Sequence, residues 1–154
     1  MVRVAIALGS NLGNRQAHLD AAVACLRSIL KEWSVSSWIE TDSVGVGRQP
    51  AFLNGAVAGR WEGEPRPLLN LLLDAEDRAG RQRPFPGSPR TLDLDLILFG
   101  DRIVDEPGLV VPHPRFRRRG FVLEPLAEIA HDMVDPVTGQ TVSELYQAFK
   151  ETQL

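Results

Sequence analysis

The chain has 154 residues, the size of one domain, and we expect a single domain over residues 1–154. Hydrophobic residues make up 44% and charged residues 24%, which excludes a disordered chain and is typical of a globular protein. The net charge is −3 at pH 7, yet residues 78–119 hold nine arginines against five acidic residues. A local arginine cluster in an acidic chain indicates a phosphorylated ligand more than a long nucleic acid. The alternative is a compositional preference for arginine with solvated charges.

The sequence also indicates where in the cell the protein is expected. No apolar stretch approaches the roughly 20 residues that cross a bilayer, and the first residues lack the pattern of a secretory signal. We therefore expect a cytoplasmic protein that binds no membrane. Cys25 is the single cysteine of the chain, so it cannot form an internal disulfide. Its apolar surroundings, from Ala21 to Leu26, predict a buried thiol.

The first half of the chain predicts a strand, a helix and two further strands. Residues 2–8 are apolar and β-branched, and residues 14–30 repeat apolar positions at steps of three and four, as a helix with one buried face does. Segments 34–41 and 52–61 are predicted as strands. The loop between them, 42–51, contains glycine and proline and is a candidate binding element.

The second half adds one strong helix, one strong strand and several short elements. The helix should begin at Pro67 and end near Gly80. Residues 81–90 contain three prolines and a glycine and cannot form regular structure. The remaining elements are expected strands at 91–99 and 102–104 and expected helices at 116–129, interrupted by Pro125, and at 142–149. The order β, α, β, β, α, β predicts an α+β ferredoxin-like sandwich, a mainly antiparallel sheet with helices packed on it.

Asp93 and Asp95 form the most informative pair of side chains. Alternate side chains of a strand share a face, so both carboxylates point to one side with Cα atoms about 6.6 Å apart. The same face is predicted to continue through Ile97 and Phe99, and the leucines from Leu92 to Leu98 face the other side. Two like charges beside apolar surface repel each other unless a cation joins them, and Mg²⁺ prefers carboxylate and phosphate oxygens. The residues alone leave two alternatives open, a metal site and an amphipathic edge strand.

Basic side chains flank this acidic strand on both sides. Arg81, Arg83 and Arg90 bracket the proline-rich loop, where guanidinium groups can neutralise charge as a phosphoryl or pyrophosphoryl group moves. His113 lies between two prolines that fix its backbone, and a basic segment follows at 115–119. Taken singly, each feature is also compatible with a solvated surface or a structural histidine. Together with the aspartate pair they favour a polyphosphate site.

Two shorter segments carry weaker signals. The turn at residues 9–13, Gly-Ser-Asn-Leu-Gly, lacks the spacing and the lysine of a phosphate-binding loop, so we interpret it as a strand-to-helix turn. Asn54 lies among apolar strand residues and is predicted to be partly buried. Its amide then needs either a backbone partner or a ligand.

Several motifs occur in one order that resembles the 6-hydroxymethyl-7,8-dihydropterin pyrophosphokinase family of folate biosynthesis. The motifs are AxGSNLG at 7–13, FLNGAV at 52–57, PRTLDLDLILFG at 89–100, VPHPR at 111–115 and RRGFVLEPLAEIA at 118–130. The likeness runs from about residue 3 to residue 150, and the PRTLDLD and VPHP blocks are specific as a pair. The resemblance implies a ferredoxin-like α+β fold. It also implies transfer of the β,γ-pyrophosphate of ATP, with Mg²⁺ (two ions), to the pterin hydroxymethyl oxygen.

The resemblance also implies a role for each residue that matches a motif position. It makes Asp93 and Asp95 the metal ligands. The other implied residues are Arg81, Arg83 and Arg90 in catalysis; Glu76, Leu96, His113 and Arg119 at the nucleotide; and Thr41, Val44, Phe52, Asn54 and Phe121 around the pterin. The two phenylalanine rings could stack on a planar bicycle. The expected partners are the two small substrates, without nucleic acid, and we expect a monomer.

The sequence departs from the family pattern in one loop and one helix position. Pro84 follows Arg83, and the run to Arg90 is about one residue short. Leu73 stands where a polar residue is often found. Two alternatives to the enzyme remain: an RNA-binding module of the same fold, disfavoured by the missing aromatic pattern and by the aspartate pair, and a member whose altered loop has abolished activity.

Overall fold

The computed structural model describes residues 1–42, 50–82, 84–86 and 88–154. Val44 and Arg83, both predicted as site residues, lie outside the described residues. The elements are β1 (Val2–Ser10), α1 (Arg15–Ile29), β2 (Lys31–Val35), β3 (Ile39–Thr41), β4 (Phe52–Trp61), α2 (Pro65–Arg78), β5 (Asp93–Phe99), β6 (Val104–Glu106), β7 (Leu109–Val111), the 3₁₀ turn η1 (Phe116–Arg118), α3 (Gly120–Ala130) and α4 (Val142–Thr152).

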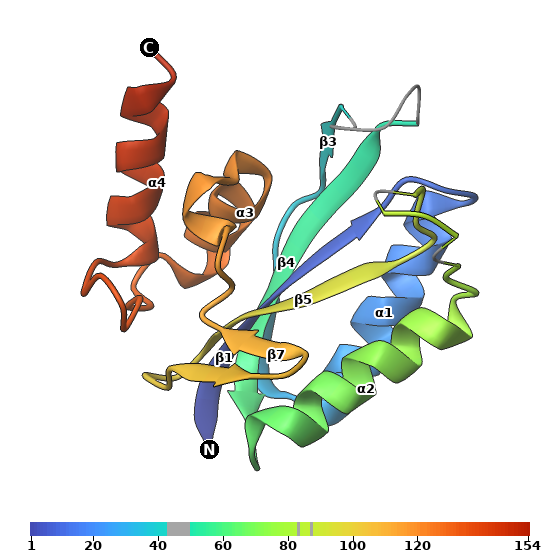
Figure 1. The fold of residues 1–154 in the computed structure, drawn as a ribbon, viewed down its shortest axis with the longest axis horizontal. Helices are drawn as coiled ribbons and strands as arrows, with labels where there is room; N and C mark the ends of the chain where they lie inside the picture. Colours follow the sequence, from blue (N-terminus) through green and yellow to red (C-terminus); the bar gives the residue numbers. More distant parts are fainter. Residues whose placement is uncertain (43–49, 83, 87) are drawn as a thin grey trace.

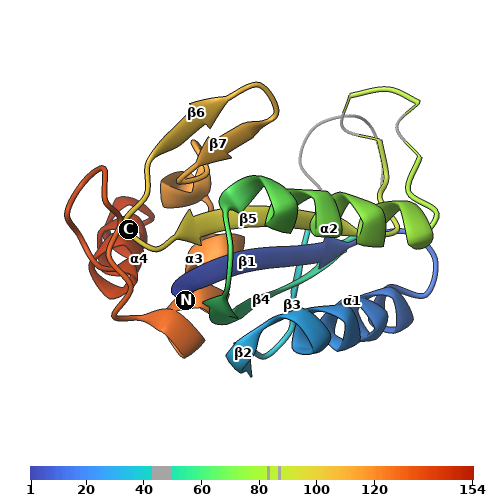
Figure 2. The same cartoon turned by 90° about the horizontal axis from the view of Figure 1, so that it is seen from below.

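The main sheet has five strands, and every described strand pair in it is antiparallel. Its order is β2–β4–β1–β5, with β3 also paired to β4. Helices α1 and α2 lie on one side of the sheet, and α3 and α4 on the other (Figures 1 and 2). This is the ferredoxin-like α+β order predicted from the sequence, with β2 and β3 together in the place of one strand.

The predicted elements differ from the observed ones in several places. The helix predicted from Pro67 to near Gly80 spans Pro65–Arg78, and the helix predicted at 116–129 is the turn η1 followed by α3. Segment 34–41 was expected as one strand, but the chain forms β2 and β3 with a break between them. The short strand expected at 102–104 lies at 104–106 and pairs with β7, which the sequence pattern did not indicate. Short strands of this kind depend on their partners more than on their own side chains.

Each face of the sheet carries its own hydrophobic cluster. Ile6, Leu8 and Leu68 belong to the cluster beneath α1 and α2, whereas Ala5 and Leu123 belong to the one beneath α3 and α4. The alternation along β1 explains this division, because successive side chains point to opposite faces. In the part of the chain that the structure describes, no helix combines the length and apolarity needed to cross a bilayer.

A β-bulge changes the predicted faces of β5. Ala5 pairs with Leu98 but Ile6 pairs with Leu96, so the isoleucine between those leucines is an extra residue. Leu98 therefore joins the cluster of α3 and α4, and Phe99 joins the cluster of α1 and α2. The prediction that Phe99 shares the face of the aspartates and that Leu98 opposes it was wrong, because strict alternation holds only up to the bulge.

The cysteine is less buried than the sequence suggests. Cys25 is half-buried, and the Arg78 Nη2 atom lies 3.6 Å from its Sγ atom. Its neighbours Ala22 and Leu26 are buried and face the sheet. The prediction of a buried thiol was therefore wrong in degree: Cys25 stands at the border of the buried helical face.

Gly55 provides a test of packing on β4. A Cβ atom added there would lie 2.4 Å from the ring atoms Cε3 and Cζ3 of Trp38. We expect Gly55→Ala to lower the free energy of unfolding by about 1–3 kcal/mol, because the ring must move away from the strand. Chemical denaturation measures this loss. In a Trp38→Ala background, Gly55→Ala should cost much less, and an unchanged stability of the single Gly55→Ala variant would contradict the close contact.

Candidate active site

Three neighbouring strands bring one predicted pterin residue and one predicted metal ligand into a single row. Gly9 of β1 pairs with Asn54 of β4 on one side and with Asp93 of β5 on the other. Directly opposed residues point to the same face, and two strand spacings separate the outer positions by about 9.5 Å. Gly9 has no side chain to fill the space between Asn54 and Asp93, and a Cβ atom there would lie 3.0 Å from Asn54 Oδ1. The row is wide enough for a flat heterocycle and one reacting arm.

Asp93 is held by an arginine that also binds a buried acid. Arg81 Nη1 lies 2.8 Å from Asp93 Oδ1 and 2.9 Å from Glu76 Oε2. Glu76 Oε2 also accepts the Leu94 backbone N–H at 2.7 Å, on the edge strand β5. Glu76 is 2% exposed, so its charge depends on these partners. The sequence predicted Glu76 at the nucleotide. In the structure it joins α2 to Arg81 of the loop and to Leu94 of β5.

Asp95 has an unusual environment for a carboxylate. Burial raises its pKa to about 7, and the negative charges of Asp93 and Glu76 add to this effect. Arg119 and Arg81 act in the opposite direction but do not cancel it. A buried carboxylate whose ionisation is opposed by neighbouring acids favours a bound cation, which offsets the repulsion.

His113 is fixed beside the aspartates by the outer edge of β5. Its backbone N–H donates to the Ile97 carbonyl at 3.0 Å, and its Nδ1 atom accepts the Arg115 backbone N–H at 3.1 Å. Burial lowers the pKa of His113, and the charge of Arg119 lowers it further. The neutral ring therefore keeps Nε2 as its remaining hydrogen-bonding nitrogen.

A pocket of about 250 Å³ opens next to this histidine. It lies between the edge strand β5, the hairpin strand β7 and α2, and it is mostly apolar with Asp95 and His113 on its wall. Leu96, predicted at the nucleotide, is among the lining residues, which are Leu69, Leu94, Asp95, Leu96, Gly108, Leu109, Val110, Val111, His113 and Pro114. An apolar slot that ends in charged groups suits a base attached to phosphates.

Three of the predicted pterin residues, Thr41, Phe52 and Asn54, lie together at the start of β4. Asn54 is 6% exposed, and its Nδ2 atom donates to Thr41 Oγ1 at 2.6 Å. The Arg90 guanidinium carbon lies 5.6 Å from the centre of the Phe52 ring, and that of Arg119 lies 5.6 Å from the centre of the Phe121 ring. Each aromatic ring thus already carries a planar cation on its face.

Helix α4 supports the start of α3, where two of these residues lie. Gly120 stands between Arg119 and Phe121, and a Cβ atom on it would lie 2.7 Å from Phe149 Cε1. The absence of a side chain therefore lets α4 contact the first turn of α3. This contact fixes the turn that carries both residues.

Asn11 is a site residue that the sequence argument missed. It is fully buried, its Oδ1 atom accepts the Arg90 backbone N–H at 2.7 Å, and its Nδ2 atom donates to the Pro50 carbonyl at 3.2 Å. Its own N–H donates to the Arg90 carbonyl at 3.0 Å. One amide therefore joins the ends of the loops 42–51 and 81–90. The signal was an asparagine in a turn, but its partners lie far along the chain.

The donor set fits a magnesium ion that shares its ligands with phosphates. Asp93 and Asp95 supply hard oxygens, and within the described ranges no group of three or more His, Cys, Asp or Glu side chains could hold a metal ion. Mg²⁺ is commonly bound by one or two carboxylates, substrate phosphates and waters. Arg81 Nε is also buried without a hydrogen-bond partner among the described residues, as expected of a donor that awaits an acceptor.

Comparison with known proteins identifies relatives along most of the chain. The chain is 44% identical over 135 residues to the 2-amino-4-hydroxy-6-hydroxymethyldihydropteridine pyrophosphokinase of Bacillus subtilis, covering 86% of this chain and 81% of that protein. It is 39% identical over 148 residues to the protein of the same name from Pseudomonas aeruginosa, covering 95% and 91%. With the Synechocystis protein of that name it shares 42% over 144 residues, covering 92% and 73%.

The fold is shared with solved structures at low sequence identity. The wild-type Plasmodium falciparum HPPK-DHPS with STZ-DHP superposes with a TM-score of 0.79 at 12% identity, over 99% of this chain and 44% of that chain. The chain thus spans less than half of that longer protein. The family model of 7,8-dihydro-6-hydroxymethylpterin-pyrophosphokinase (HPPK) matches residues 5–131, most of the chain. Together with the bacterial relatives, this match shows that the chain belongs to the 7,8-dihydro-6-hydroxymethylpterin pyrophosphokinase family.

Proposed function

We propose that the chain transfers the β,γ-pyrophosphate of ATP to the hydroxymethyl oxygen of 6-hydroxymethyl-7,8-dihydropterin through the residues gathered around Gly9. Family membership makes it a pyrophosphokinase of folate biosynthesis with ATP as co-substrate. The observation that carries the residue roles is the row from Asn54 across Gly9 to Asp93. In this arrangement a heterocycle at Asn54 would lie about two strand spacings from phosphates at Asp93.

Asp93 and Asp95 would hold two Mg²⁺ ions together with the phosphates of ATP. When bound, the metal supplies positive charge that neutralises the developing negative charge of the transferred group. Arg81 donates to Asp93 in the structure, so a cation already sits at this carboxylate. Its remaining donors and Arg119 then face the phosphates, where a planar fork binds two oxygens at once.

The nucleotide base would occupy the apolar pocket between α2, β5 and β7. Leu69 and Leu96 supply apolar contacts there, and the backbone of β7 lines the far side. His113, kept neutral by burial and by Arg119, can donate or accept at the phosphate end. The pocket therefore directs the phosphates toward Asp95.

The pterin ring would lie at the other end of the row. Asn54 offers an amide for the polar edge of the ring, and Phe52 and Phe121 offer two aromatic faces. The arginines over those faces, Arg90 and Arg119, lie beside the path to the phosphates. The hydroxymethyl arm can then approach the transferred group from the side opposite to the leaving AMP.

Product analysis tests the proposed reaction. The protein, ATP and Mg²⁺ are incubated with and without 6-hydroxymethyl-7,8-dihydropterin, and nucleotides are separated by chromatography. We expect AMP in place of ADP, and only when the pterin is present. ADP as the product, or AMP formed equally without the pterin, would exclude this reaction and favour the alternative of a member without the activity.

Asn54→Leu tests the pterin site. We expect the pterin dissociation constant to rise by about tenfold or more, because the ring loses a buried amide partner worth about 1–3 kcal/mol. Nucleotide binding to the free protein should stay near the wild-type value. Calorimetric titration measures both, with the exposed Gln147→Leu as the control for an added apolar side chain.

The Asn54–Thr41 hydrogen bond allows a different outcome to be recognised. If Asn54 serves the fold alone, Asn54→Leu lowers the melting temperature and leaves pterin affinity near the wild-type value. That result in a folded variant would remove Asn54 from the site.

A further inference from the structure

Three basic residues cross one end of the sheet in a row. Arg3 of β1 pairs directly with Arg60 of β4, and Arg60 pairs with Lys31 of β2. Like charges placed directly opposite one another destabilise a sheet. The row lies six residues before Gly9 on β1, about 20 Å from the proposed catalytic row. It is therefore a separate cationic feature with a cost to the fold.

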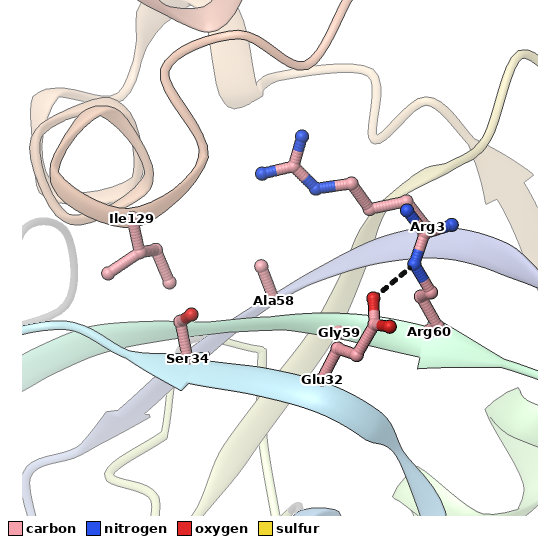
Figure 3. Close-up of a pocket in the computed structure, with 7 residues that line it drawn as sticks. All are labelled: Arg3, Glu32, Ser34, Ala58, Gly59, Arg60 and Ile129. Atoms are coloured by element: carbon pink, nitrogen blue, oxygen red, sulfur yellow. Dashed lines mark hydrogen bonds and ion pairs between the residues drawn. The ribbon is translucent and has the colours of Figure 1, made fainter.

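A pocket of about 220 Å³ adjoins two of these arginines. Figure 3 shows Arg3 and Arg60 at one side of the hollow and Ile129 of α3 at the other, with Ala58 and Ser34 between them. The complete lining is Arg3, Glu32, Ser34, Ala58, Gly59, Arg60 and Ile129. Cationic groups thus face a nonpolar side chain and a hydroxyl across a space smaller than a drug-sized site.

Arg3 and Arg60 each use only part of their guanidinium groups in ion pairs. Arg60 uses its Nε atom for Glu32 Oε2 at 2.6 Å, and Arg3 uses its Nη1 atom for both Asp132 carboxylate oxygens at 2.9 Å. Among the described residues, their other guanidinium nitrogens make no side-chain hydrogen bond. The paired acids are exposed: 74% of the Glu32 side chain and 61% of the Asp132 side chain are accessible to solvent. Such surface ion pairs are weak, so an incoming anion can compete with them.

Glu32 limits the charge that the pocket can accept. Arg3, Arg60 and Glu32 in the lining give a net charge of +1, which a monoanion neutralises and a dianion would exceed. Ile129 supplies a nonpolar contact in this mostly polar lining, so a ligand with a small nonpolar part can be accommodated. We propose that this pocket binds a small organic monocarboxylate, with the carboxylate on Arg3 and Arg60 and the nonpolar part against Ile129.

Benzoate is a suitable probe for the wild-type protein. At ten times its dissociation constant, benzoate should raise Tm by about 4 °C at low ionic strength. Benzamide, which has the same shape without the charge, and inorganic phosphate, which carries more charge, should each give less than a third of that shift. Nuclear magnetic resonance should show the largest amide shifts at Ser34, Ala58 and Gly59.

Two variants should change the benzoate affinity in opposite directions, which a general effect of ionic strength does not do. Arg60→Gln should weaken benzoate binding about tenfold, and Glu32→Gln should strengthen it about threefold by removing the repelling charge. Arg102→Gln is the matched control, because Arg102 also forms an exposed ion pair, with Glu64 at 3.2 Å, but lies outside this pocket.

Each remaining outcome counts against the proposal. Equal Tm shifts with benzamide remove the role of the arginines, and equal shifts with phosphate remove the choice of a monocarboxylate. A loss of binding in Arg102→Gln as large as that in Arg60→Gln indicates a nonspecific ion effect. If Arg60→Gln does not fold, the amide shifts of the wild-type protein decide, and shifts centred on Asp93 and His113 overturn the site.

Discussion

Asp95→Asn should abolish turnover and at the same time make the ligand-free protein more stable. The substitution removes a proposed metal ligand, so we expect the catalytic rate to fall by about a hundredfold or more. It also removes a carboxylate whose ionisation is opposed by burial and by Asp93 and Glu76. At pH 8 in metal-free buffer, the free energy of unfolding should rise by on the order of 2 kcal/mol.

The pH dependence separates this effect from a general change in packing. The pKa of Asp95 is about 7 in the folded protein and 3.8 without its environment. The wild type is therefore most stable, with respect to this group, when Asp95 is protonated, and it loses stability as the pH rises from about 4 to about 7. The gap between Asp95→Asn and the wild type should be largest at pH 8 and vanish near pH 4.

Asp105→Asn provides the control for the aspartate. Asp105 lies exposed on β6, outside the site, so its variant should keep both activity and the pH profile of the wild type. Asp95→Asn with activity within tenfold of the wild type would contradict the metal assignment. A melting temperature that falls at pH 8 would contradict the repulsion between the acids.

Arg81→Met should slow the chemical step far more than it weakens ATP binding. We expect a loss of about a hundredfold in the single-turnover rate, because a preorganised donor to the transferred group is removed. The dissociation constant of ATP should change by less than about threefold, since the base pocket is untouched. Rapid-quench kinetics and nucleotide titration measure the two quantities separately.

The same substitution should also destabilise the fold, and a second change separates the two effects. Arg81→Met breaks the ion pair with the buried Glu76 carboxylate, which costs about 3 kcal/mol. Adding Glu76→Gln removes that charge while its amide oxygen can still accept the Leu94 N–H. Stability should then largely return, but the rate should stay low. Recovery of the rate along with stability would make Arg81 a structural residue.

Sequence patterns predicted the helices and strands that are determined by residues close together in the chain. The repeats of α1 and α2 and the apolar strands β1, β4 and β5 carry the ferredoxin-like order, and strand alternation placed Asp93 and Asp95 on one face. The same rule failed for Phe99, because a bulge depends on the partner strand. Hairpin strand β7 was missed for a similar reason, since it is three residues long and is defined by its pairing.

The site shows the same division at the level of single side chains. Motif positions indicated Asn54, His113 and the arginines, but they did not indicate that Asn54 and Asp93 share a row. That fact needs the register of three strands. Nor did they indicate that Glu76 accepts the Leu94 N–H, 18 residues away, or that Asn11 binds Arg90, 79 residues away. Such contacts are set by tertiary packing and have no local pattern.

The hydrogen bonds at the two ends of the proline-rich loop have a consequence for evolution. Arg81 is anchored by Glu76 and Asp93, and the backbone of Arg90 is anchored by Asn11. The positions of the two arginines are therefore set by partners outside the loop, and the number of residues between them is free to drift. A residue can then be lost or gained there without moving either arginine. The intervening residues can then adapt reaction rate or substrate entry while the chemistry is inherited unchanged.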